Sequence, residues 1–167
     1  MSTSRSVVLV GTCHPYQYPG NKWHAQFRAL IRQLCEQHGV RAIAEESNKE
    51  ALAKANEKKS ICMEVAKSLS IKHRLVDPDS EQRESLGIID EEVIGLNITG
   101  KKSDEEISKS KSAARTAREC YWLREIVDLN SWPTLMICGA NHVQSFSEIL
   151  HQQNISVKIA ERDWCHT

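Results

Sequence analysis

The segment Val7-Val8-Leu9-Val10-Gly11-Thr12-Cys13-His14 places a glycine and a histidine soon after four apolar residues. Short apolar runs rich in β-branched residues predict strands that are buried on both faces, as in parallel sheets. The pattern recurs later, where a strand predicted over Thr134–Cys138 is followed by Gly139-Ala140-Asn141-His142. Two strands that each end in Gly-x-x-His therefore indicate both the fold class and the place of a candidate site.

The rest of the chain alternates between strand and helix patterns. Further strands are predicted over Val40–Glu45, Ile71–Val76 and Ile155–Ile159. Helices are predicted between Asn21 and Gly39, over Glu81–Leu86 and over Asn141–Gln152. Another helical stretch begins at the capping box of Ser47 and Glu50 and continues to Leu69, and a long helix after residues 96–112 ends near Leu129. Such alternation predicts a single α/β domain over residues 1–167, a three-layer fold with a mostly parallel sheet of about five strands.

One stretch between the third and fourth strands is polar rather than periodic. Residues 96–112 contain four lysines, several serines and one glycine, Gly100. We expect this segment to be mobile, to lead into the long helix that ends near Leu129, and to act as a lid over the site. Its lysines are interspersed with acidic residues, so a solvated surface explains it better than a nucleic-acid patch.

The composition is that of an ordinary globular protein. The 167 residues include 22 Lys and Arg and 22 Asp and Glu, a formal net charge of +0, so no nucleic-acid partner is expected. No apolar run approaches the ~20 residues of a membrane span and no secretory signal is recognised, so no membrane partner is expected. The six cysteines form no C-x-x-C pair, which argues against a zinc ribbon or a disulfide framework and favours a cytoplasmic protein.

Functional side chains are predicted beyond the carboxyl ends of the strands, where parallel sheets bind ligands. The candidates there are His14, His142 and the carboxylates Glu45 and Glu46. Imidazoles with a carboxylate suit a divalent metal such as Mn, Co or Zn, and they also suit direct acid–base catalysis. We expect His14, His142 and Glu45 to bind the metal or to work directly as catalytic acid and base. Glu45 is preferred because Glu46 points to the opposite face, but the choice between the two glutamates stays open.

Three further residues are candidates for catalysis. Asp77 follows the third strand and is expected to ligate the metal or to orient a histidine. Arg118 interrupts an apolar helix face, so it is expected to bind a carboxylate or a substrate oxyanion. Arg83 lies six residues after Asp77 and is expected to act in the same way. Each of these residues also has a purely structural interpretation. Asp77 could form a turn, Arg118 could extend its charged end to the surface, His14 could be a loop residue and His142 could cap a helix.

Nucleophilic catalysis by cysteine is a weaker alternative. Cys13 and Cys138 flank the predicted site and could pair with a histidine. Cys138 ends a buried strand, where a thiol is usually inert. The sequence has no Gly-x-Ser-x-Gly, P-loop or Gly-x-Gly-x-x-Gly motif, so it gives no support for the serine-hydrolase, nucleoside-triphosphatase or dinucleotide-binding classes that use them.

The order of these motifs resembles the TraB/PrgY and Tiki family, with erythromycin-esterase-like and ChaN-like proteins as wider relatives. In the family pattern a strand leads to a first Gly-x-x-His, a Glu closes the next strand, an Asp and an Arg follow the third, a helix carries another Arg, and a second Gly-x-x-His comes last. The matching residues here are Gly11 to His14, Glu45, Asp77 with Arg83, Arg118, and Gly139 to His142. The resemblance implies an α/β fold and metal-dependent hydrolysis. Tiki members are similar to metalloproteases, esterase-like relatives cleave a lactone, and ChaN-like relatives bind haem.

The sequence thus favours a metal-dependent hydrolase that acts on an ester, amide or phosphoester bond of a small molecule or peptide. The alternative is a non-enzymatic module that binds a metal or small ligand within a larger assembly. A third interpretation is a partner-binding domain whose site has decayed. Formation of a homo-oligomer is left open.

Overall fold

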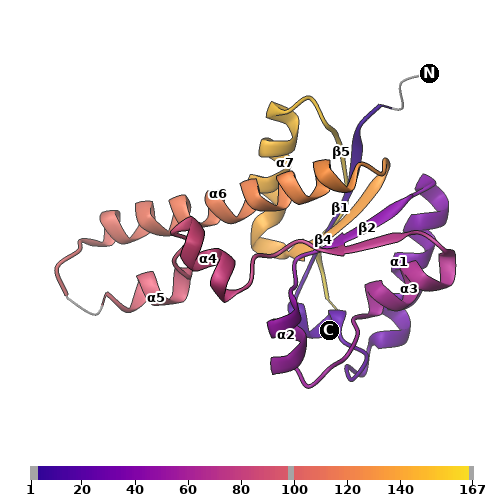
Figure 1. Cartoon of the computed structure of the whole chain (residues 1–167), viewed down its shortest axis with the longest axis horizontal. Helices are drawn as coiled ribbons and strands as arrows, with labels where there is room; N and C mark the ends of the chain where they lie inside the picture. Colours follow the sequence, from indigo (N-terminus) through magenta and orange to yellow (C-terminus); the bar gives the residue numbers. More distant parts are fainter. Residues whose placement is uncertain (1–3, 98–99, 166–167) are drawn as a thin grey trace.

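The computed structural model describes residues 4–97 and 100–165, and at its centre is a sheet of five parallel strands. They are β1 (Ser6–Thr12), β2 (Ala42–Glu45), β3 (Lys72–Leu75), β4 (Thr134–Gly139) and β5 (Ser156–Trp164), in the spatial order β3-β2-β4-β1-β5. Helices cover both faces of the sheet (Figure 1). The prediction of an α/β fold with a parallel five-stranded sheet between helical layers is therefore confirmed.

Most of the helices lie close to their predicted places, but the helix over Glu91–Leu96 was not predicted from the sequence. The helices are α1 (His24–His38), α2 (Lys49–Lys54), α3 (Ile61–Leu69), α4 (Ser80–Leu86), α5 (Glu91–Leu96), α6 (Asp104–Leu129) and α7 (Val143–Gln152), with 3-10 helices η1 (His14–Gln17) and η2 (Ala140–His142). The region predicted as one helical stretch from Ser47 to Leu69 holds two helices. Asn48 and Ser60 each cap a separate first turn by accepting a hydrogen bond from a backbone N–H. β5 also continues beyond Ile159, to Trp164.

The polar segment 96–112 is helical from Asp104 onward rather than a loop throughout. Ser103 and Glu106 form a capping box in which each side chain accepts a hydrogen bond from the backbone N–H of the other residue, so α6 starts there. Residues 98–99, which belong to the segment predicted to be mobile, lie outside the described residues. Asp90 and Glu91, which precede this segment, line the cavities described below. The role of a lid for residues 96–112 stays a prediction.

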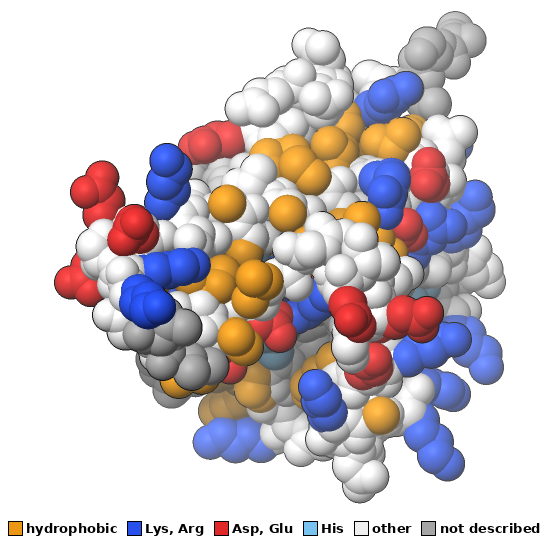
Figure 2. Space-filling model, turned by 60° about the vertical axis from the view of Figure 1, so that its left-hand side comes forward, with side chains coloured by type: hydrophobic (Ala, Val, Ile, Leu, Met, Phe, Trp, Pro, Cys, Tyr) orange, Lys and Arg blue, Asp and Glu red, His pale blue; other side chains and the backbone are white. Residues whose placement is uncertain are grey.

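The N-terminal half of α6 extends beyond the sheet with α4 and α5 beside it, and we refer to residues 80–97 and 104–117 as the arm (Figure 1). An ion pair ties α5 to α6, since Arg115 Nη2 lies 2.8 Å from Glu91 Oε2. The large apolar side chains that the arm exposes are Leu86, Ile89, Val93 and Leu96. Figure 2 brings this end of the molecule forward and shows hydrophobic side chains among charged ones.

Each face of the sheet carries its own core. Phe27 of α1 packs with α3 on one face, and Trp122 of α6 packs with Phe146 of α7 on the other. Alternate residues of β2 join different cores: Ile43 belongs to the α1/α3 face and Ala44 to the α6/α7 face. This alternation decides which side chains reach the candidate site. In the described part of the chain, no helix combines the length and the apolar character that crossing a membrane requires.

Candidate active site

The two Gly-x-x-His segments lie side by side at the carboxyl end of the sheet. β1 and β4 are neighbouring parallel strands whose register pairs Thr12 with Gly139. The short helices η1 and η2 follow directly and carry His14 and His142. The Nε2 atom of each imidazole lies 3.7 Å from the same oxygen, Oε1 of Glu46. Two neighbouring strands with the same ending thus bring two imidazoles to one carboxylate.

Glu46 is the carboxylate that the structure places between the histidines. Its side chain is almost fully buried. Oε1 accepts a hydrogen bond from Arg118 Nη2 at 2.9 Å, and Oε2 accepts one from the backbone N–H of Gly139 at 2.6 Å. Both oxygens of Glu46 are therefore fixed, one by α6 and the other by the end of β4.

Glu45, the glutamate preferred from the sequence, lies away from the histidines on the opposite face of the sheet. Its Oε2 accepts a hydrogen bond from Ser60 Oγ at 2.6 Å and lies 3.1 Å from His73 Nε2. Glu45 alternates with Ala44, so its side chain enters the α1/α3 face with that of Ile43. Strand alternation in the sequence separates the two glutamates, but it does not say which face receives the histidines.

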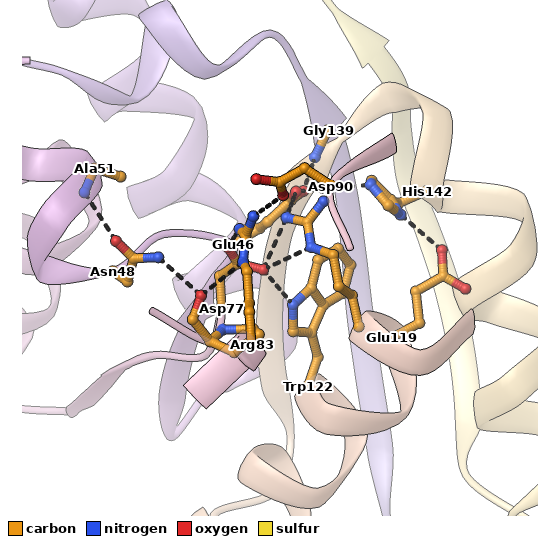
Figure 3. Close-up of polar contacts among 12 residues, drawn as sticks. Glu46, Asn48, Ala51, Asp77, Arg83, Asp90, Glu119, Trp122, Gly139 and His142 are labelled. Carbon is orange, nitrogen blue, oxygen red and sulfur yellow. Dashed lines mark hydrogen bonds and ion pairs between the residues drawn. The ribbon is translucent and has the colours of Figure 1, made fainter. Parts of the chain in front are cut away.

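Asp77 accepts four hydrogen bonds and holds Arg118 against Glu46. Its Oδ1 accepts from Arg118 Nε and Nη2 at 3.1 and 2.8 Å and from the Trp122 indole at 3.0 Å. Its Oδ2 accepts from Arg83 Nη2 at 2.6 Å. Figure 3 shows Asp77, Arg83 and Trp122 converging beside Glu46. The structure therefore brings the three sequence candidates Asp77, Arg83 and Arg118 into one network.

The carboxylates around Arg118 favour the charged form of its guanidinium. Burial by itself lowers the pKa of the guanidinium, but the carboxylates of Asp77 and Glu46 outweigh burial and hold the pKa of Arg118 above its ordinary value. Arg83 extends the network outward, since its Nε donates to Pro78 O at 3.0 Å and its Nη1 pairs with Asp90 beside α5. The site is thus an ion-pair network that links the sheet, α4, α5 and α6.

Glu119 is a site residue that the sequence analysis missed. This fully buried residue of α6 places Oε1 2.7 Å from His142 Nδ1 and accepts a hydrogen bond from Ser145 Oγ at 2.6 Å. With the Nδ1 proton assigned to this bond, the lone pair of Nε2 is on the side of Glu46. The sequence does contain one indication of this role. Glu119 lies three residues before Trp122, so the two side chains share the buried side of α6.

His14 is held more loosely than His142. Its side chain is 51% exposed, whereas that of His142 is 8% exposed. The buried Gln17 places its side-chain nitrogen 3.2 Å from His14 Nδ1, and this contact orients the ring. His14 is therefore the member of the pair with room to adjust to a ligand.

Polar cavities meet at these residues. One cavity of about 470 Å³ extends toward α2, and another of about 570 Å³ extends over the ends of β1, β4 and β5. Both are lined by His14, Glu46 and Arg118. The site is therefore open to a ligand from two directions, and most of the surrounding side chains are charged or polar.

The surroundings of Cys138 argue against nucleophilic catalysis by its thiol. Burial raises the pKa of the Cys138 thiol well above its ordinary value, and the carboxylates of Glu46 and Glu119 raise it further. A thiol of this kind is a poor nucleophile. Cys13 is exposed and lines the larger of the two cavities.

The residues at the site fit a divalent metal in chemistry and come close in distance. Bonds of about 2.0–2.1 Å to zinc place two ligands of a tetrahedral site roughly 3.4 Å apart, whereas Nε2 of either histidine lies 3.7 Å from Glu46 Oε1. Among residues 4–97 and 100–165, no group of three or more His, Cys, Asp or Glu side chains is already arranged to hold an ion. The site supplies two imidazoles and one carboxylate, and Glu119 would orient His142 in the way that metal-bound histidines require.

Comparison with known proteins identifies no relative: no family model, curated protein or solved structure matches the chain. The likeness to TraB/PrgY and Tiki proteins therefore rests on the order of short motifs alone.

The glycines that begin the two motifs have different roles, which predicts different effects of substitution. A Cβ at Gly11 would lie 2.1 Å from the carbonyl oxygen of Arg162, whereas one at Gly139 would lie 3.4 Å from Glu46 Oε2 and 3.6 Å from His14 Nε2. We expect Gly11→Ala to lower the free energy of unfolding by roughly 3 kcal/mol and Gly139→Ala by less than about 1 kcal/mol. Urea denaturation of both variants measures the difference, and equal losses would contradict it.

Proposed function

We propose that this protein is a metal-dependent hydrolase whose reaction centre comprises His14, His142 and Glu46. The observation that carries the proposal is the approach of both imidazole Nε2 atoms to within 3.7 Å of Glu46 Oε1 where two polar cavities meet. The oxygen that both imidazoles approach also accepts a hydrogen bond from Arg118, so a bound cation would be held by two imidazoles and a carboxylate that is already oriented. The motif order that resembles TraB/PrgY and Tiki proteins supports the same class of reaction.

Each residue has a distinct role in this proposal. His14 and His142 would hold Mn, Co or Zn through Nε2, and Glu46 would hold it through Oε1. A metal bound there supplies a Lewis acid that polarises a carbonyl or phosphoryl oxygen and lowers the pKa of a bound water. Arg118, which lines both cavities, stabilises negative charge on the reacting oxygen. Glu119 fixes the ring of His142.

Asp77 and Arg83 act as positioning residues. Asp77 accepts two hydrogen bonds from Arg118, and Arg83 neutralises the second oxygen of Asp77. The substrate class stays broad: an ester, amide or phosphoester of a polar small molecule or peptide suits cavities lined by charged side chains. The six free cysteines support a reducing compartment such as the cytoplasm. The neutral net charge gives no support for a nucleic-acid partner.

A second candidate function is a non-enzymatic module that binds a metal or a small ligand. The observation in its favour is that Arg83, Arg115 and Arg118 are each paired with a carboxylate. These pairs neutralise the positive charge that would otherwise attract an anionic substrate. The exposed apolar side chains of the arm are compatible with assembly into a homo-oligomer or a larger complex.

Turnover by the metal-loaded protein separates these functions. The probes are p-nitrophenyl acetate, bis-p-nitrophenyl phosphate and a simple lactone, each with added Mn, Co or Zn. We expect hydrolysis of at least one probe, falling by about 100-fold or more in His142→Ala, as for loss of a metal ligand, while His151→Ala, a change on the far end of α7, keeps the rate. Metal binding without hydrolysis of any probe would favour the binding module. If the protein neither binds a metal nor hydrolyses a probe, both the hydrolase and the metal-binding module are contradicted.

A further inference from the structure

Two exposed cysteines follow paired residues of neighbouring strands, next to the candidate site. β1 and β5 are parallel, and their register pairs Thr12 with Trp164. The hydroxyl of Thr12 also donates to the carbonyl oxygen of Trp164 at 2.9 Å. Cys13 and Cys165 are the first residues after the two strands, and both are exposed and free. They are far apart in the sequence but adjacent in the register.

The backbone places these two cysteines within reach of each other. Neighbouring strands lie about 4.8 Å apart, and a disulfide needs a Cα separation of roughly 4.4–6.8 Å. Cys13 keeps an extended backbone, with φ −84° and ψ 136°, so β1 has not yet turned away at this position. The end of β5 is held in place as well, because the ring of Trp164 packs against those of Tyr16 and Phe27.

Both side chains belong to the same side of the sheet. Paired residues of parallel strands point to the same face, so the residues after Thr12 and Trp164 share the other face. Cys13 lines the cavity over the strand ends together with Asp163. The register between β1 and β5 shifts between Val10 and Thr12, so alternation is counted from the pair of Thr12 and Trp164 onward.

The remaining cysteines do not compete for this pairing. Cys35, Cys62 and Cys138 are buried, and burial raises the pKa of the Cys35 thiol to about 11 and those of the other two well above the ordinary value. Cys120 is exposed on α6 but is not among the residues that line the cavity beside Cys13. It therefore serves as a matched control.

We propose that Cys13 and Cys165 are a redox-active pair that closes to a disulfide when the protein meets a peroxide. The Cys13 sulfur attacks one oxygen of hydrogen peroxide, the O–O bond breaks, and water leaves with the thiol proton, which gives a sulfenic acid. The Cys165 sulfur then attacks the Cys13 sulfur, the S–O bond breaks, and a second water leaves with the Cys165 proton. Two thiols are oxidised by two electrons, and the peroxide is reduced to two waters.

The disulfide would fix the residue directly before His14 to the end of β5. Oxidants would thereby act on the backbone that carries one of the two site histidines. The pairing follows from the register of the sheet and stands independently of the proposed hydrolysis.

The test is peptide mapping of the full chain after treatment with hydrogen peroxide under native conditions, followed by alkylation with N-ethylmaleimide in denaturant. We expect a peptide cross-linked between Cys13 and Cys165 and an alkylated Cys120. Cys120→Ser should keep the cross-link, whereas Cys165→Ser should abolish it and leave a sulfenic acid at Cys13 that dimedone traps. Separate alkylation of Cys13 and Cys165 in the oxidised wild type, or a cross-link of either to Cys120 or to another chain, would overturn the proposal.

Discussion

Asp77→Ala is expected to lower the free energy of unfolding by about 3–5 kcal/mol, the cost of removing one partner from a buried ion pair. Asp77 is 8% exposed and accepts four hydrogen bonds, from two arginines and a tryptophan. Its removal leaves Arg118 buried with Glu46 as the remaining carboxylate and leaves the Trp122 indole without its acceptor. Urea denaturation followed by tryptophan fluorescence measures the loss.

Asp79→Ala is the matched control for this prediction. Asp79 lies two residues further along the chain, and its side chain caps α4 by accepting from the Gln82 N–H. Loss of such a cap costs about 1 kcal/mol. Asp77→Asn, which keeps the shape of the side chain, provides a measurable value if Asp77→Ala does not fold. Equal losses in Asp77→Asn and Asp79→Ala would show that the network around Asp77 is not the structural support of the site.

Glu46→Gln is expected to weaken the binding of Co²⁺ by about 100-fold or more, because it removes the carboxylate that lies 3.7 Å from both histidines. The amide keeps the volume of the side chain and one acceptor oxygen, but its NH2 group cannot accept, so the variant loses the hydrogen bond from either Gly139 N–H or Arg118 Nη2. Titration followed by the visible absorption of bound cobalt measures the affinity.

Glu45→Gln is the control at the neighbouring position. It removes a charge that lies beside Ser60 and His73 on the opposite face of the sheet, so it is expected to change stability but not the affinity for cobalt. Weakened binding of cobalt in Glu45→Gln with normal binding in Glu46→Gln would show that Glu45 is the ligand, as expected from the sequence. Equal binding in both variants and the wild type would place any metal elsewhere.

The fold could be predicted from the sequence because its signals are local. The apolar runs that end in Gly11 and Gly139, and the helical periods between them, suffice to predict a parallel sheet covered on two sides. The beginning of α6 was harder to predict, because it depends on the capping box of Ser103 and Glu106 rather than on an apolar face. α5 was missed because its exposed apolar side chains follow no buried period.

The site could be predicted only in part, because its assembly depends on which face of the sheet each side chain enters. His14, His142, Asp77, Arg83 and Arg118 are brought together as expected from the rule that ligands bind at the carboxyl ends of parallel strands. Glu46 rather than Glu45 joins the site because α6 covers the face of the sheet that Glu46 enters. No local pattern in the sequence shows which face α6 covers. Glu119 was missed because it is recognisable only once His142 is seen beside α6.

Elemental analysis of the purified protein, grown with added Mn, Co and Zn, shows whether His14 and His142 hold a metal ion together. Wild-type protein is compared with the His14→Ala/His142→Ala double variant, and circular dichroism confirms that both are folded. We expect near-stoichiometric metal in the wild type and its loss in the folded double variant. Wild-type protein without metal after supplementation, or metal retained in the double variant, would contradict a metal centre built from the two Gly-x-x-His segments.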